Sequence, residues 1–144
     1  MIAKSKIKAC FRQLAEAGID HPKNVYEAKS NVEHYQKMLS LLPNKDMVCL
    51  ELGFGLGYFA LVLKKLLGYK VYGIDHPSRK FVKDKHFKNF VKKERFIIKY
   101  QDMLKERFDF PDNFFDAITF VEVLEHLEPN KVDHVFREIR RVLK

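Results

Sequence analysis

Residues 48–60 constrain the fold of this chain more than any other segment. A short apolar run ends at Glu51, and a helical pattern begins a few residues later. Between them, Gly53, Gly55 and Gly57 alternate with other residues. Glycine lacks Cβ, so its backbone can adopt positive φ and let a ligand approach closely. A helix that begins after such a turn presents unpaired N–H groups and the positive end of its dipole. The segment therefore predicts a strand, a tight turn and a helix that bind a nucleotide-like molecule.

The glycine spacing alone leaves two cofactors open. Read from Gly55, the residues up to Ala60 fit the G-x-G-x-x-G/A fingerprint of dinucleotide-binding folds. Read from Glu51, the segment resembles the first motif of the class I S-adenosylmethionine (SAM)-dependent methyltransferases, acid-x-Gly-x-Gly-x-Gly. The turn alone does not distinguish SAM from NAD, so the rest of the chain has to decide.

Length and composition predict one globular unit. The chain has 144 residues, of which 47% are hydrophobic, enough for one core. No apolar run approaches the roughly 20 residues that span a bilayer, and the first residues lack the apolar core of a signal peptide. Cys10 and Cys49 are the only cysteines, with no spacing typical of a metal site or disulfide framework. We therefore expect a cytoplasmic protein without a membrane partner, and Cys49 in the core.

Residues 1–46 show two amphipathic helical patterns. Apolar residues recur at helical spacing over 7–14, and Gly18 is the expected end of that helix. A second pattern covers 32–42 and ends before Pro43. We expect these helices to precede a SAM-binding half-domain over residues 47–144.

Strands alternate with helices in the remaining sequence. Strands are expected at 47–52, 70–74, 96–100 and 115–121, and helices at 58–67, from Pro77 to about 92, and at 129–143. This alternation predicts a Rossmann-like three-layer α/β sandwich with a parallel sheet in the order 3-2-1-4 and ligands at the carboxyl ends of its strands. The last helix carries an apolar stripe formed by Val132, Val135, Phe136, Ile139, Val142 and Leu143.

Asp75 follows the second predicted strand, 18 residues after Gly57. A carboxylate near this separation can accept hydrogen bonds from both ribose hydroxyls of a nucleotide. Both SAM and NAD contain such a ribose, so Asp75 does not distinguish them. The alternative role is an N-cap for the helix expected from Pro77.

A second motif favours SAM over NAD. The sequence from Phe115 to Leu127, FDAITFVEVLEHL, closely resembles the fourth-strand motif of the same methyltransferase family, and the preceding FPDN resembles its usual approach. By this resemblance, Asp102 accepts from the adenine amino group and the Met103 N–H faces a ring nitrogen. Glu51 lies near the ammonium group of the methionine part, and Glu122 joins the cofactor-binding residues.

His126 and Glu125 are the candidate catalytic residues, because they lie just past the fourth strand, where the acceptor is expected. A general base is needed only if the acceptor keeps its proton at working pH. His126 suits that role since its ordinary pKa lies near neutrality. The alternative is that both residues only shape the loop.

The pattern Glu122-x-x-Glu125-His126 also suggests a speculative metal site. It resembles the divalent-metal ligands of small-RNA 3′-end 2′-O-methyltransferases and of certain quinone-precursor O-methyltransferases. Oxygen and imidazole ligands on one turn suit Mg²⁺ or a softer ion. No second downstream histidine of those subgroups can be matched. The leading expectation is therefore no metal.

Much of the excess of basic over acidic residues lies between Arg79 and Lys99. The net charge is +8, and this segment contains Lys80, Lys83, Lys85, Lys88, Lys92, Lys93 and Arg95. The functional interpretation is a patch for nucleic acid or an anionic substrate. The alternative is a solvated helix face, and the spacing of Phe81, Phe87 and Phe90 indicates that these rings face the core.

The resemblance covers residues 47–144 and stops where the family continues into strands 5–7, which are missing from this sequence. The fourth strand would then be an exposed apolar edge, which invites pairing with another chain. Three explanations stay open: a shortened piece of a longer protein, a naturally split or degenerate gene, or an edge covered by a second copy or a partner chain. The resemblance predicts methyl transfer from SAM to a small-molecule nucleophile, with S-adenosylhomocysteine as product. The alternatives are a metal-using RNA methyltransferase, a non-catalytic SAM-binding or dimerisation module, and an NAD-dependent dehydrogenase.

Overall fold

A four-stranded parallel sheet in the order β3-β2-β1-β4 forms the centre of the molecule. This is the predicted order, with the reversal between β1 and β4 that right-handed crossovers produce. The computed structural model describes residues 2–19, 29–43 and 45–144. The strands are β1 (Val48–Leu52), β2 (Lys70–Asp75), β3 (Ile97–Tyr100) and β4 (Ala117–Thr119).

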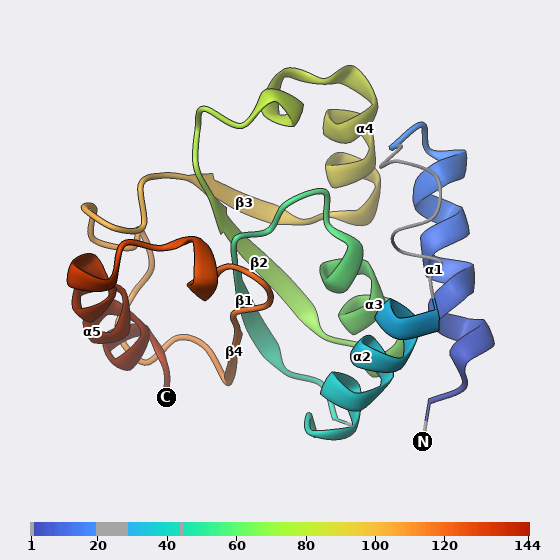
Figure 1. Cartoon of the computed structure of the whole chain (residues 1–144), viewed down its shortest axis with the longest axis horizontal. Coiled ribbons are helices and arrows are strands. Elements are labelled where there is room, and N and C mark those ends of the chain that lie inside the picture. Colours follow the sequence, from blue (N-terminus) through green and yellow to red (C-terminus); the bar gives the residue numbers. More distant parts are fainter. Residues whose placement is uncertain (1, 20–28, 44) are drawn as a thin grey trace.

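Helices cover both faces of the sheet and complete three layers (Figure 1). Successive strand residues alternate between two cores: Cys49 and Val71 belong to one, Leu50 and Tyr72 to the other. The first core lies against α1 (Lys4–Glu16), α2 (Lys29–Ser40), α3 (Tyr58–Leu67) and α4 (Lys85–Glu94), and the second against α5 (Val132–Val142).

The helix after the glycine turn has the predicted bounds, because every local signal agrees there. α3 follows directly on Gly57 and ends at Leu67, where Gly68 adopts φ 75° and caps the last turn. Both predicted N-terminal helices are also present, and Gly18 ends the first with φ 75°. Residues 1, 20–28 and 44 of the predicted helical region lie outside the described part.

The prediction of a helix starting at Pro77 is wrong. His76 and Ser78 form a hydrogen-bonded turn, with His76 Nδ1 2.7 Å from Ser78 Oγ, and a 3₁₀ turn over Lys80–Lys83 follows. The α-helix begins only at Lys85, because the Asp84 carboxylate accepts the Phe87 N–H at 2.8 Å and caps it. The alternative of Asp75 as an N-cap therefore also fails.

The fourth strand and the last helix are shorter than predicted. Phe115 makes only an isolated bridge to Leu143, and the chain leaves the sheet after Thr119 to run over the carboxyl edge of the strands. A 3₁₀ turn over Pro129–Lys131 precedes α5. The predicted stripe is also partly wrong, since Phe136 is 49% exposed.

Glu138 is buried on α5 because it has ionic partners. Its carboxylate accepts from the Arg141 guanidinium at 2.6 Å and from the Phe108 N–H at 2.8 Å. Arg141 also donates to the carbonyls of Phe108 and Phe110. These bonds hold α5 against the loop that follows β3.

The two cysteines lie in the core as free thiols. Burial raises the pKa of Cys49 to about 12, and the nearby Glu51 adds to the effect. Among the described residues, no helix is both long and apolar enough to cross a membrane.

Candidate functional site

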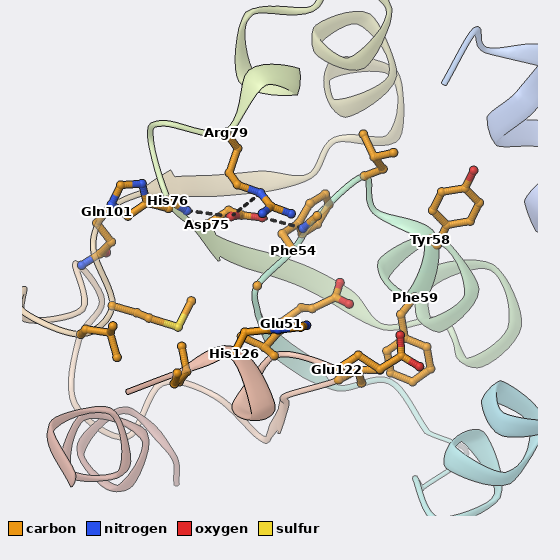
Figure 2. A pocket seen from close by; sticks show the side chains of 18 of the residues that line it. Glu51, Phe54, Tyr58, Phe59, Asp75, His76, Arg79, Gln101, Glu122 and His126 are labelled. Atoms are coloured by element: carbon orange, nitrogen blue, oxygen red, sulfur yellow. Dashed lines mark hydrogen bonds and ion pairs between the residues drawn. The ribbon is translucent and has the colours of Figure 1, made fainter. Parts of the chain in front are cut away.

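A pocket of about 360 Å³ opens beyond the carboxyl ends of the strands (Figure 2). This is the edge of a parallel sheet where ligands are expected, and the volume lies within the usual range for small-molecule sites. The loops after β1, β2, β3 and β4 all contribute to its walls. The predicted site residues that line it are Glu51, Gly53, Gly55, Asp75, Asp102, Met103, Glu122 and His126.

The glycine turn has the backbone that its sequence predicts. Gly53, Gly55 and Gly57 have φ of 73°, 56° and 82°, a left-handed conformation that other residues rarely adopt. At Gly53 a Cβ would lie 2.3 Å from Val123, so that position requires glycine on packing grounds too. At Gly55 a Cβ would meet no side chain, with the nearest atom 3.8 Å away. This open space in the pocket wall lets a ligand approach the backbone.

Asp75 fastens the glycine turn to the end of β2. One carboxylate oxygen accepts the Gly55 N–H at 2.6 Å, and the other accepts the His76 N–H at 2.7 Å. Arg79 lies 3.8 Å away as an ionic partner on the pocket margin. A carboxylate has about four lone-pair sites, so acceptor capacity remains for ribose hydroxyls. The fastening role was not predicted from the sequence, because it depends on a contact between two separate loops.

Glu51 is the most unusual group in the pocket. The residue is 4% exposed, and Oε2 is buried without a hydrogen-bond partner among the described residues. Burial raises its pKa well above the usual value, the Asp75 carboxylate raises it further, and the Ala60 N–H opposes them. An unpartnered buried carboxyl is costly, and a bound cation would supply its missing partner.

Asp102 and Met103 form the wall contributed by the loop after β3. Partial burial acts to raise the pKa of Asp102, but the Leu104 N–H and Lys105 ammonium hold it below its usual value. Gln101 is mostly buried but also lines the pocket, and its side-chain amide holds the loop by donating to the Arg107 carbonyl at 2.9 Å. The loop therefore presents an ionised acid and an apolar side chain at a fixed place.

The loop after β4 brings Glu122 and His126 to the pocket, whereas Glu125 lies outside the lining. Glu122 has φ 52°, a strained conformation for a residue with a side chain. Among the described residues, no group of three His, Cys, Asp or Glu is arranged to hold a metal ion. The three residues of the speculative metal site are all described, and they do not form such a group.

Several lining residues were not predicted as part of the site. They include Tyr35 of α2 and, from the glycine turn and α3, Phe54, Tyr58 and Phe59. The sequence pattern indicates that these aromatic residues belong to the core, and most of their surface is indeed buried. Tyr35 and Phe59 meet edge to face with their ring centroids 5.0 Å apart, a contact between distant parts of the chain that the residue order does not indicate. Arg79 had a local signal, since it lies four residues after Asp75.

The residues present fit an adenosyl cofactor that carries an ammonium group. The site combines an open glycine backbone, a carboxylate with spare acceptor capacity and a buried carboxyl without a partner among the described residues. A ligand can approach the glycine backbone closely. The Asp75 carboxylate can accept hydrogen bonds from ribose hydroxyls, and the Glu51 carboxyl can pair with an ammonium group.

The chain belongs to the methyltransferase domain family, whose sequence model matches residues 50–144, more than half of the chain. The matched region holds most of the sheet, the glycine turn and all four acids of the pocket. Among curated proteins, no sequence matches this chain.

Solved structures show the same fold. A protein from Pyrococcus horikoshii is 28% identical with a TM-score of 0.67, over 84% of this chain and 55% of that one. A SAM-dependent methyltransferase from Aquifex aeolicus is 25% identical with a TM-score of 0.61, over 100% of this chain and 69% of that one. A Haemonchus contortus phosphoethanolamine N-methyltransferase, solved with S-adenosylhomocysteine, is 21% identical with a TM-score of 0.64, over 78% of this chain and 26% of that one. The chain spans about half the length of the first structures it matches.

Proposed function

We propose that this domain binds SAM in the pocket and transfers its methyl group to a small-molecule nucleophile, releasing S-adenosylhomocysteine. The buried carboxyl of Glu51, unpartnered among the described residues, is the observation that carries the proposal. The methionine part of SAM has an ammonium group that satisfies such a carboxyl through a charge-assisted hydrogen bond. A dinucleotide has no ammonium group to offer, so it would leave this carboxyl without a cationic partner.

Each acid of the pocket then has a distinct binding role. Glu51 accepts from the ammonium group, and Asp75 accepts from the ribose hydroxyls while still holding the Gly55 N–H. Asp102 accepts from the adenine amino group, and its lowered pKa keeps it ionised for that purpose. Met103 supplies apolar contact to the ring from the same loop.

The sulfonium of SAM supplies a methyl group with a good leaving group, so catalysis depends largely on holding the acceptor in line. His126 lies on the pocket wall, where it can take a proton from a hydroxyl or amine acceptor. Glu122 lies on the same loop and orients the acceptor or the cofactor. Glu125, outside the lining, is the weaker catalytic candidate.

Isothermal titration calorimetry with S-adenosylhomocysteine tests the proposal, with NAD⁺ as the competing ligand. We expect S-adenosylhomocysteine to bind and NAD⁺ not to bind. Glu51→Gln should lower the affinity for S-adenosylhomocysteine about tenfold to a hundredfold, which is the cost of one hydrogen bond to a charged group. Glu16→Gln is the matched control, because Glu16 is exposed on α1, away from the pocket. Binding of NAD⁺ in preference, or equal affinities for both variants, would contradict the proposal.

A further inference from the structure

The net positive charge of this chain is concentrated in one short segment. Residues 79–99 contain nine lysines and arginines but only two acids, Asp84 and Glu94, whereas the whole chain has a net charge of +8. The other 123 residues are therefore close to neutral. Such an uneven distribution indicates a local electrostatic feature rather than a generally basic protein.

The structure places most of these cations on one surface, here called the α4 basic face. Phe87 and Phe90 fix the orientation of α4 by packing into the core, which turns the lysines of the helix outward. Phe81 packs against the same core from the preceding 3₁₀ turn, so all three aromatic rings lie where the sequence predicted. The face consists of the exposed residues Lys80, Lys83, Lys85, Lys88, Lys92, Lys93 and Arg95.

Few acids compensate this face. In the described part of the chain, two cations of residues 79–99 form ion pairs: Arg79 pairs with Asp75, and Lys99 pairs with Asp109. Neither Arg79 nor Lys99 belongs to the face. Glu94 is buried and is occupied by Lys64 and Lys65 of α3. The Asp84 carboxylate caps α4. The lysines of the face therefore repel one another, and a polyanion is the partner that would relieve the repulsion.

The face connects two hollows of the molecule. Arg79, at the margin of the cofactor pocket, directly precedes Lys80. From there α4 extends for about 15 Å along the outside of the sheet (Figure 1). At its other end, Lys93 and Arg95 line a second cavity of about 720 Å³ together with Lys64, Lys65 and Lys70.

We propose that the α4 basic face binds single-stranded RNA through its phosphate backbone. A membrane surface fits less well, because interfacial helices insert an apolar face, and the apolar side of α4 is buried. A protein partner fits less well, because binding energy between proteins concentrates in aromatic and arginine anchors, and the face holds a single arginine, Arg95, and no aromatic side chain. RNA is the polyanion that presents unpaired stretches.

The binding is expected to be independent of base sequence. Phe87 and Phe90 are buried, and the half-buried ring of Phe81 packs against the core with the Arg79 guanidinium 5.5 Å from its centroid, so the main contacts left are those between lysine and phosphate. Such contacts release counterions, so affinity should fall steeply with salt. The bound strand would pass the margin of the cofactor pocket at Arg79. The binding itself requires no methyl transfer, so its test is separate from that of the proposed function.

Fluorescence anisotropy with a labelled oligouridine of about 20 nucleotides tests the proposal over a series of KCl concentrations. The variant Lys85→Glu/Lys88→Glu/Lys92→Glu reverses three charges on the face. The control variant reverses three exposed charges on α1 and α2, so both proteins have the same net charge. Thermal melting checks that both variants fold. The control substitutions are Lys6→Glu, Lys8→Glu and Lys37→Glu.

We expect the face variant to bind at least about tenfold more weakly and to lower the slope of log affinity against log salt by about 2, near 0.7 per lost contact. The control variant should stay within about threefold of the native chain. An equal loss of RNA affinity in both variants would show that binding depends only on the net charge of the protein, and this would overturn the proposal. Undetectable RNA binding by the native chain, tighter binding to duplex DNA, or binding only to phosphatidylserine vesicles would also overturn it.

Discussion

The pocket and the α4 basic face hold charge in opposite ways. In the pocket, Glu51 and Asp75 are almost fully buried, and the pKa of Glu51 depends on its burial and on a few nearby groups. On the basic face, seven cations stand in solvent with little compensation. Buried charges interact strongly with individual partners, whereas exposed charges act weakly one by one and together through the ionic atmosphere.

This difference predicts where single substitutions matter. A single substitution in the pocket should change stability or ligand affinity strongly, because the backbone conformation and the packing there do not tolerate a different side chain. One change on the basic face should leave stability unaltered and alter only the salt dependence of binding. The expected effects therefore decrease from the glycine turn, through Glu51, to the lysines of α4.

Replacing Gly53 with alanine should have the largest effect. An L-residue in left-handed backbone costs about 1–2 kcal/mol, and forced overpacking adds about 1–3 kcal/mol. At Gly53 both apply, since φ is 73° and a Cβ would lie 2.3 Å from Val123. Urea unfolding should therefore show a loss of about 2–5 kcal/mol.

Gly55→Ala is the matched control, because φ is also positive there but the space is open. It should cost only the backbone contribution of about 1–2 kcal/mol and, by filling the approach to the backbone, weaken S-adenosylhomocysteine binding. Equal destabilisation by the two substitutions would show that Val123 does not restrict the glycine turn.

Glu51→Gln should stabilise the ligand-free protein at alkaline pH while weakening its ligand. The pKa of Glu51 is raised by burial, so its contribution to stability is full below the unfolded pKa and is lost as pH rises through the folded pKa. Glutamine does not ionise and avoids that loss. Melting curves from about pH 5 to pH 9 should show a growing advantage for the variant, on the order of 1 kcal/mol. A difference that stays constant with pH would mean that Glu51 does not change ionisation in this range.

Lys88→Ala should have the smallest effect. Lys88 is exposed on α4, so the free energy of unfolding should change by less than about 0.5 kcal/mol. The slope of log RNA affinity against log salt concentration should fall by about 0.7 for this variant, which corresponds to one lost phosphate contact. A large loss of stability would show that the lysine packs against the fold rather than facing a partner.

The glycine turn and the sheet order could be predicted from the sequence because many local signals agree there. The apolar strand, the glycines, the helix and Gly68 all indicate the same boundaries, and α3 has the predicted range. The acids at the strand ends reach one pocket because parallel strands place their carboxyl ends at one edge.

Local patterns failed where contacts between distant residues decide the structure. The Asp84 cap, rather than Pro77, starts α4. Arg141 allows Glu138 to be buried on α5, while the apolar Phe136 remains exposed. The oxygen of Glu51 that lacks a partner among the described residues is likewise a property of packing around it and has no signal in the residue order.

Proton release on ligand binding shows whether Glu51 receives the ammonium group of an adenosyl cofactor. S-adenosylhomocysteine is titrated calorimetrically below the raised pKa of Glu51 in buffers with different ionisation enthalpies. Because the cation favours the ionised carboxylate, the native protein should release close to one proton per ligand bound, and Glu51→Gln should release none. Binding without proton release by the native protein, or identical release by both proteins, would contradict this role of Glu51.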